Sequence, residues 1–339
     1  FMDKWPDPKK IIYVPEKKKS WPSNIWTRGV YNEGLMALYQ LSKDPVLLSY
    51  ATRWADDHNW DLRGGYTTRN ADNQCAGQTY FELFLQNKDT MRIHNIKASI
   101  DAMVASTKVD DWNWIDAIQM AMPVFAQLGN YYNEPAYYQK MWAIYNHTRS
   151  EIGGTGLYNP ADGLWWRDKD FMPPYKEPNG KDCYWSRGNG WVVAALVRVL
   201  QTIPTQTPHY QDYLNDYKAM MAALITRQRS DGFWNVSLDD PGHFGGKELT
   251  GTALFTYGLA WGIRHHVLDE KTYLPSALKA WDGMVRSALH ENGFLGYVQG
   301  TGKEPKESQP VGYDHKPDFE DFGLGCFLLA GSEIYLLNP

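Results

Sequence analysis

The sequence predicts an all-α protein in which helical hairpins close into an α/α barrel. Apolar residues recur at helical spacing along most of the 339 residues, and the alternation typical of strands is rare. Glycine- and proline-rich stretches separate the helical segments, as loops between helices do. Barrels of this length often form one unit, so we expect a single domain over residues 1–339, with residues 1–22 as an irregular N-terminal arm.

Eleven segments carry the helical pattern. A ring of six hairpins needs twelve helices, so one of its positions is expected to be irregular. The expected helices cover residues 25–42, 45–58, 72–87, 90–106, 113–129, 134–150, 184–203, 208–229, 247–267, 271–289 and 319–337.

A weak internal repeat supports the ring. Residues 162–165, 231–234 and 291–294 each place a turn before an aromatic residue, and a loop and a helix rich in small residues follow. Small residues allow inner helices to approach closely, and a recurrence of roughly 60–70 residues is typical of stacked hairpins. An open solenoid would show the same repeat, but it gives no reason for so many tryptophan-bearing loops. The closed barrel is therefore favoured.

Composition excludes several classes of protein. The net charge is -5 and the longest basic run is Lys17–Lys19, so nothing indicates binding to nucleic acid. No apolar run approaches the length of a membrane-spanning helix, and insertion into a membrane is not expected. Cys75, Cys183 and Cys326 lack metal-type spacing and are expected to be small buried residues. The 15 Trp and 22 Tyr suit stacking on sugar rings, but packing within a helical ring explains them equally well.

The segment Asp110–Pro123 holds the first candidate acidic residue. Asp111 is a plausible helix N-cap, whereas Asp116 falls within the first turns, beside Trp114 and Ile115. Apolar surroundings raise the pKa of a carboxyl group, which is what a general acid needs near neutral pH. From spacing alone, a buried aspartate that caps or hydrogen-bonds a neighbouring helix is the more common case.

A second aspartate, Asp72, stands at the expected start of a helix within residues 70–78. N-capping is the ordinary role of an aspartate at this position. Without other information, capping is favoured over a functional role for Asp72.

The segment 184–191 sets an arginine among tryptophans and glycines, which is not the composition of a solvated helix face. The fork of Arg187 suits a bidentate grip on a substrate carboxylate, with Trp185 and Trp191 stacking on a sugar ring. The alternative is an arginine paired with a structural aspartate.

Further candidates lie in loops that lead into helices rich in small residues, and each could line the same mouth of the barrel. A surface or capping role is the default for each of them. The nine histidines show no HExxH or similar pair, and no phosphate or dinucleotide fingerprint appears, so neither a metal nor an organic cofactor is expected. These candidates are Trp165, Trp166, Arg167, Asp168, His243, Glu248, Glu320 and Asp321.

Three segments taken in order carry a resemblance to a known family: Ala71-Asp72-Asn73-Gln74-Cys75-Ala76-Gly77, Trp114-Ile115-Asp116 and Trp185-Ser186-Arg187-Gly188-Asn189-Gly190-Trp191. With them the chain, from about Trp26 to Leu337, resembles the unsaturated glucuronyl and rhamnogalacturonyl hydrolases of glycoside hydrolase families 88 and 105, more closely the latter. The resemblance implies an (α/α)6 barrel. It also implies removal of a 4,5-unsaturated uronic acid from the non-reducing end of lyase-generated oligosaccharides, by acid-catalysed hydration of the C4=C5 vinyl ether.

The same resemblance assigns roles to residues. Asp116 matches the acid/base catalyst, and Asp72 matches a second aspartate that binds the unsaturated sugar and assists. The segment that contacts the sugar and its carboxylate gives Trp185, Arg187 and Trp191. The expected partner is the oligosaccharide substrate, and we expect four further residues to contact it: Trp166, Arg167, His243 and Glu248.

One departure from the family pattern concerns Arg167. Rhamnogalacturonyl-type members have a histidine in this loop, which here reads Trp165-Trp166-Arg167-Asp168. A second cation there could grip the uronate carboxylate or serve a different sugar at the next subsite. The neighbouring sugar and the parent polysaccharide are therefore not predicted.

Alternative functions remain open from the sequence. A polysaccharide lyase or a sugar epimerase could use the same barrel, and so could a binding protein without turnover. The oligomeric state is not predicted. We expect a periplasmic or secreted protein whose signal peptide is not in this chain, with the cytoplasm as the alternative.

Overall fold

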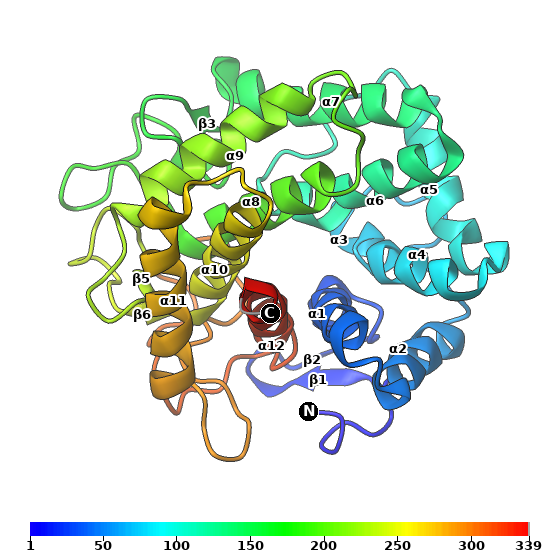
Figure 1. Ribbon diagram of the computed structural model, residues 1–339, viewed down its shortest axis with the longest axis horizontal. Helices are drawn as coiled ribbons and strands as arrows, with labels where there is room; N and C mark the ends of the chain where they lie inside the picture. The colour runs from blue at the N-terminus through cyan, green and yellow to red at the C-terminus, as the bar shows by residue number, and fades with distance from the viewer. Residues whose placement is uncertain (338–339) are drawn as a thin grey trace.

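The computed structural model describes residues 1–337 and shows a closed barrel of helices (Figure 1). The α-helices are α1 (Trp26–Ser42), α2 (Pro45–Asp57), α3 (Ala71–Gln74), α4 (Ala76–Asn87), α5 (His94–Val104), α6 (Asp116–Tyr132), α7 (Pro135–Ser150), α8 (Ser186–Leu200), α9 (Tyr210–Ile225), α10 (Leu249–Arg264), α11 (Glu270–Ser287) and α12 (Phe322–Leu337). Helices α1, α4, α6, α8, α10 and α12 form the inner ring, in which α12 packs against α1. Helices α2, α5, α7, α9 and α11 form the outer layer. The predicted (α/α)6 barrel is confirmed for the described residues, and positions 338 and 339 of the predicted domain lie outside them.

The N-terminal arm takes the place of a twelfth ring helix. It lies beside α1 and α12 and carries a hairpin of two strands, β1 (Ile12–Val14) and β2 (Lys19–Trp21) (Figure 1). The Arg28 guanidinium of α1 donates to the Pro8 carbonyl at 3.3 Å and ties the arm to the ring. Within this arm, which is expected to be irregular, Ile12–Val14 pairs in antiparallel register with Lys19–Trp21.

Short elements in the loops complete the fold. Two further antiparallel pairs lie before α8 and α10, and 3₁₀ turns occur near several helix ends. The strands are β3 (Tyr158–Asn159) with β4 (Leu164–Trp165) and β5 (Trp234–Asn235) with β6 (Lys247–Glu248), and the 3₁₀ turns are Pro15–Lys17, Thr90–Ile93, Ile152–Gly154 and Lys169–Phe171.

The predicted helix boundaries agree with the structure to within a few residues except at two places. The predicted helix 72–87 is divided into α3 and α4, although Cys75 between them keeps right-handed helical torsion angles. The predicted helix 90–106 begins with a 3₁₀ turn before α5. Both differences leave each segment at its place in the ring, so the order of inner and outer helices is unaffected.

Glycines set the spacing between inner helices, as the small-residue repeat predicts. A Cβ atom at Gly34 of α1 would lie 2.3 Å from the Gly325 carbonyl oxygen of α12. At Gly251 of α10, a Cβ atom would lie 2.2 Å from the Ser186 hydroxyl at the start of α8. Any larger side chain at these positions would push the inner helices apart, so the ring depends on glycine here.

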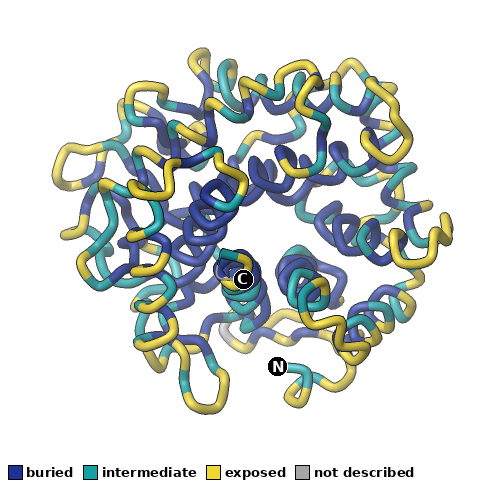
Figure 2. The backbone as a smooth tube through the Cα atoms, viewed as in Figure 1, coloured by how far each residue is buried: buried dark blue, intermediate teal, exposed yellow. Residues whose placement is uncertain are grey.

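A polar network braces the interior of the barrel. Arg198 of α8 donates to Glu82 and Gln78 of α4 at 2.7 and 2.8 Å, and its Nη1 lies 3.9 Å from Glu33 on α1, the helix opposite in the ring. Gln119 of α6 donates to Glu33 at 2.8 Å. Burial raises the pKa of Glu33 to about 7. Figure 2 shows that these inner helices are buried while the exposed segments lie at the periphery.

The cysteine prediction is confirmed, since Cys75, Cys183 and Cys326 are all buried and none forms a disulfide. The buried thiols therefore contribute apolar volume to the core.

Residues 1–337 include no helix that combines the length and apolar character needed to cross a membrane.

Candidate active site

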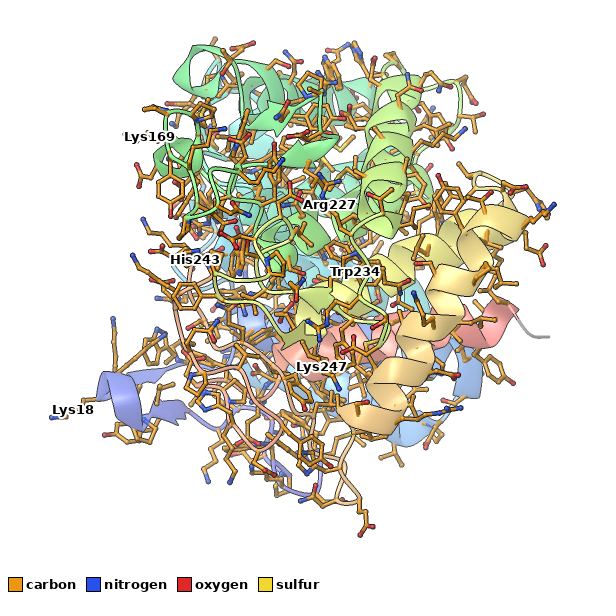
Figure 3. All side chains as sticks on the ribbon, turned by 90° about the vertical axis from the view of Figure 1, so that its left-hand side faces the viewer. Lys18, Lys169, Arg227, Trp234, His243 and Lys247 are labelled. Carbon is orange, nitrogen blue, oxygen red and sulfur yellow. The ribbon has the colours of Figure 1, made fainter. Side chains whose placement is uncertain are left out.

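The first residues of the inner helices lie together at one end of the barrel, because all six inner helices run in the same direction. The long loops before α8 and α10 cover this end, and Figure 3 shows Lys169 and His243 of these loops on the same side of the molecule. Both predicted acidic residues are here, since Asp72 belongs to α3 and Asp116 is the first residue of α6. Peptide dipoles give each helix N-terminus a partial positive charge, so this end favours an anionic ligand.

Asp116 forms an ion pair with Arg167. The Nε atom of Arg167 donates to Oδ2 of Asp116 at 3.1 Å, and the two side chains are 18% and 12% exposed. The pair is therefore shielded from bulk water but still reaches the surface. The prediction of purely apolar surroundings for Asp116 is incomplete, because the loop before α8 brings this cation from 51 positions further along the chain.

Backbone contacts hold Arg167 beside Asp116. Trp114 and Asp168 pair as an antiparallel bridge, and the Ile115 amide donates to the Arg167 carbonyl at 2.9 Å. One carboxylate oxygen of Asp168 accepts from Nη1 of Arg167 at 2.7 Å, and the other caps the 3₁₀ turn that follows. Arg167 thus bridges two carboxylates and is anchored through its main chain as well.

Asp111 does not cap α6, contrary to the prediction. Both of its carboxylate oxygens are held by Arg69, at 2.8 and 2.6 Å. Ile115 occupies the N-cap position without a side-chain hydrogen bond. Helix α6 therefore begins at Asp116, three residues later than the predicted start at 113.

Asp72 is not the N-cap of its helix either. Asn70 caps α3 by accepting from the Asn73 amide at 3.2 Å, and Asp72 lies in the first turn. Burial and the neighbouring carboxylate of Asp116 raise the pKa of Asp72 to about 6, although the nearby cations Arg167 and Arg63 act in the opposite direction. No hydrogen bond to another part of residues 1–337 engages its carboxylate. The default interpretation of Asp72 as a capping residue is therefore wrong, and its carboxylate shares one electrostatic site with Asp116.

Arg187 holds a loop in the described structure. Its side chain is 1% exposed, Nη1 donates to the Gln299 carbonyl, and Nη2 donates to the Gly300 carbonyl at 2.9 Å. The guanidinium also lies 4.5 Å from the Trp185 ring, whose Nε1 donates to the Gln299 side chain at 2.9 Å. The predicted bidentate grip on a substrate does not match this geometry, because the fork already binds backbone carbonyls. Arg187 and Trp185 fix the 299–300 loop over the barrel end.

Trp191 contributes to the floor of the barrel end. Its ring is 1% exposed and meets Trp26 of α1 edge to face, with ring centroids 6.1 Å apart. Helices α1 and α8 are opposite one another in the ring, so these side chains fill its centre, and Phe322 joins them 5.2 Å from Trp26. Trp191 is too deeply buried to stack on a sugar in this structure, whereas Trp26 is only partly buried.

The other three predicted contacts differ in character. Glu248 is fully buried and caps α10 by accepting from the amides of Thr250 and Gly251, so the prediction that it contacts substrate is contradicted by its capping role. Trp166 is 7% exposed and packs near Tyr184. His243 is partly exposed and its Nδ1 lies 3.2 Å from Glu177. Its role and that of Trp166 remain predictions.

A cleft of about 540 Å³ opens beside the ion pair. Arg167, Asp168 and Trp114 line it, together with the start of the loop after α7. Residues 1–337 contain no group of three or more histidine, cysteine, aspartate or glutamate side chains arranged to hold a metal ion.

Residues 1–337 match a protein-family model described as Glycosyl Hydrolase Family 88. The chain belongs to this family. The resemblance predicted from the three motifs is confirmed for family 88. The prediction that the chain resembles family 105 more closely stays a prediction.

The relatives cover most of the chain. A protein from Formosa agariphila named unsaturated 3S-rhamnoglycuronyl hydrolase is 30% identical over 333 residues, which span 92% of this chain and 85% of the relative. A solved family 88 structure from Bacteroides vulgatus is 31% identical with a TM-score of 0.86, covering 93% of this chain and 92% of the other. A solved structure described as a polysaccharide lyase gives the same identity, TM-score and coverage. The whole barrel, not one motif, is therefore shared.

Sequence reasoning missed several residues of this family 88 site. Asn189 lies in the quoted motif, yet its role emerges only in three dimensions: it accepts from the Trp165 amide at 2.9 Å and so fixes the loop that carries Arg167. Asp168 was a weak candidate within the segment Trp165–Asp168, and its hydrogen bond with Arg167 emerges only in the structure. Trp26 was not singled out for the site, and no signal in the sequence pointed to it.

The raised pKa of Asp72 predicts a pH dependence for the family 88 reaction. If the Asp72 carboxylate stabilises a developing cation, kcat/KM should rise as pH rises through about 6, because the free enzyme loses its proton from Asp72 there. Asp72→Asn should lower kcat/KM on the order of 10²-fold and abolish this rise of kcat/KM with pH. Initial rates between pH 4 and 9 measure the pH dependence. An Asp72→Asn profile that keeps an inflection near 6 would assign the rise to a different group.

Proposed function

We propose that this family 88 protein removes a 4,5-unsaturated uronic acid from the non-reducing end of oligosaccharides released by polysaccharide lyases. The observation that carries the proposal is the placement of Asp116 beside a second carboxylate, Asp72, and a cation, Arg167, where the inner helices begin. The name of the Formosa agariphila relative supports the same substrate class and makes rhamnose the proposed neighbouring sugar.

The proposed reaction adds water across the C4=C5 bond, which is a vinyl ether because the ring oxygen is bonded to C5. Asp116 donates its carboxyl proton to C4, which leaves an oxocarbenium-like cation at C5. The resulting Asp116 carboxylate takes a proton from water as the water oxygen bonds to C5. The hemiketal formed at C5 opens the ring, C1 becomes a hemiacetal, and its bond to the next sugar breaks.

This route explains why the two carboxylates differ in function. Ordinary glycoside hydrolysis uses a pair that flanks the anomeric carbon, one protonating the leaving group and the other attacking or activating water. Hydration of a vinyl ether needs one residue that first donates and then accepts a proton, and we assign Asp116 to it. It also needs an anion near the cationic carbon, and we assign Asp72 to that task because the two carboxylates interact.

The test follows the ultraviolet absorbance of the conjugated C4=C5 bond during incubation with lyase-generated oligosaccharides. The panel pairs unsaturated glucuronyl and galacturonyl ends with rhamnose or with other neighbours. We expect absorbance to fall with release of the neighbouring sugar. Absence of any decrease across the panel would contradict the proposed function.

A second candidate function is polysaccharide lyase activity, which the description of one similar solved structure favours. A lyase creates the conjugated bond and increases the absorbance of an intact uronic-acid polysaccharide, the opposite sign to that expected for hydration. A sugar epimerase would change neither signal, and a binding protein would show affinity without turnover. The absorbance assay on intact and lyase-treated polysaccharide therefore separates hydrolase from lyase, and analysis of the sugar products together with a binding measurement separates epimerase from binding protein.

A further inference from the structure

Arg167 connects the proposed proton donor to the open cleft. Its Nε binds Asp116 at 3.1 Å, its Nη1 binds Asp168 at 2.7 Å, and the side chain lines the cleft beside Trp114. Within residues 1–337 no hydrogen bond from Nη2 is formed. Two of the three guanidinium nitrogens are therefore bound by the protein, and Nη2 is the nitrogen through which a ligand could first bind.

The contact with Asp116 obstructs the proposed reaction. Oδ2 of Asp116 accepts the arginine hydrogen bond, so this contact has to loosen before Oδ2 can carry a proton towards a substrate. The contact with Asp168 need not loosen at the same time, because Asp168 is anchored by the bridge to Trp114 and by capping a 3₁₀ turn. The guanidinium can therefore exchange one partner while the other holds it in place.

The substrate brings a competing partner to the same place. In a 4,5-unsaturated uronate the carboxylate carbon and C4 are both bonded to C5, so the carboxylate lies next to the carbon that receives the proton. Any group that touches the proton donor is then close to the substrate carboxylate. A carboxylate binds a guanidinium fork through two parallel hydrogen bonds, which are stronger than the single bond that Asp116 accepts.

We propose that Arg167 is a positioning residue that couples recognition of the uronate carboxylate to release of Asp116. This inference rests on the proposed function. In the free enzyme Arg167 holds the Asp116 carboxylate. On binding, the substrate carboxylate takes over the guanidinium, and the released Asp116 takes up a proton from solvent water and donates it to C4. A sugar without a free carboxylate cannot displace Asp116 and is turned over slowly even when it binds.

The test compares an unsaturated uronyl disaccharide with its methyl ester, which keeps the C4=C5 bond but has no carboxylate. Wild-type kcat should be about 10–100-fold lower on the ester, since one charge-assisted exchange is lost. In Arg167→Gln, Asp116 is no longer held, so kcat on the ester should rise several-fold above the wild-type value while kcat/KM on the acid falls. Arg167 acting only as a binding residue would raise KM for the acid and leave kcat on the ester unchanged.

Arg149→Gln is the matched control. Arg149 also binds an aspartate through its fork, Asp216 at 2.7 and 2.8 Å, but joins outer helices α7 and α9. We expect its acid-to-ester ratio to equal that of the wild type. Should Arg167→Gln fail to fold, the wild-type ratio still decides, because equal kcat values on acid and ester would overturn the coupling. Loss of activity on both substrates in the wild type would instead overturn the proposed function.

Discussion

Replacing Asp116 with asparagine should lower turnover of an unsaturated uronide by at least about 10²–10⁴-fold, the usual contribution of one general acid–base residue. Asparagine has nearly the same shape, and its oxygen can still accept the Arg167 hydrogen bond, so the barrel end should keep its structure. It cannot supply a proton to C4 or remove one from water, so both halves of the reaction are lost. The rate of absorbance loss measures the effect, and the circular dichroism spectrum should be unchanged.

Asp111→Asn provides the comparison for this substitution. Asp111 lies in the loop before α6, five positions before Asp116, and is bound by Arg69. Its replacement removes one negative charge at a similar place in the fold, so turnover should remain within about threefold of the wild type. Equal losses in the two variants would mean that Asp116 acts through loop structure, and undiminished turnover in Asp116→Asn would reject its catalytic assignment.

The second large effect is on stability. Arg198→Met should destabilise the barrel by about 3–5 kcal/mol, because it leaves the fully buried Glu33 and the partly buried Glu82 without their shared cation. Arg198 also joins helices on opposite sides of the inner ring, and methionine restores volume but none of these hydrogen bonds. Urea unfolding followed by circular dichroism measures the change in the free energy of unfolding.

Two further variants identify the cause of this loss. Arg264→Met removes an arginine that pairs with Glu333 and is 30% exposed, so it should cost no more than about 1 kcal/mol. Adding Glu33→Gln and Glu82→Gln to Arg198→Met removes the uncompensated charges and should recover part of the stability. If the triple variant is no more stable than Arg198→Met, lost packing rather than buried charge is responsible.

The sequence was sufficient for the helices and their order because periodicity is a local property. The spacing of apolar residues located each helix, and small residues at Gly251 and Gly325 correctly indicated close inner packing. Details that depend on distant partners were missed. Helix α6 begins at Asp116 instead of the predicted residue 113, because residue 114 pairs with residue 168. The sequence near residue 113 does not predict that bridge.

The candidate site was predictable in its acidic pair but not in its cations. Motif resemblance identified Asp72 and Asp116, and the structure places both at one end of the barrel. The same resemblance suggested Arg187 for the substrate, yet its fork is occupied by loop carbonyls, whereas Arg167 binds Asp116 directly. Hydrogen-bond partners more than 50 positions away determine whether each guanidinium is free to bind a substrate. A motif of seven residues does not include these partners and so cannot predict them.

The contact between the first and last inner helices has a consequence for biosynthesis. Arg28 of α1 binds Asp321, 293 positions later, immediately before α12 begins. Closing so long a segment is entropically costly and cannot occur until Asp321 has left the ribosome. We therefore expect the earlier hairpins to assemble as an open arc, with the apolar flanks of α1 and α10 exposed until α12 inserts between them. The nascent arc, rather than the finished barrel, is the species that chaperones need to protect from aggregation.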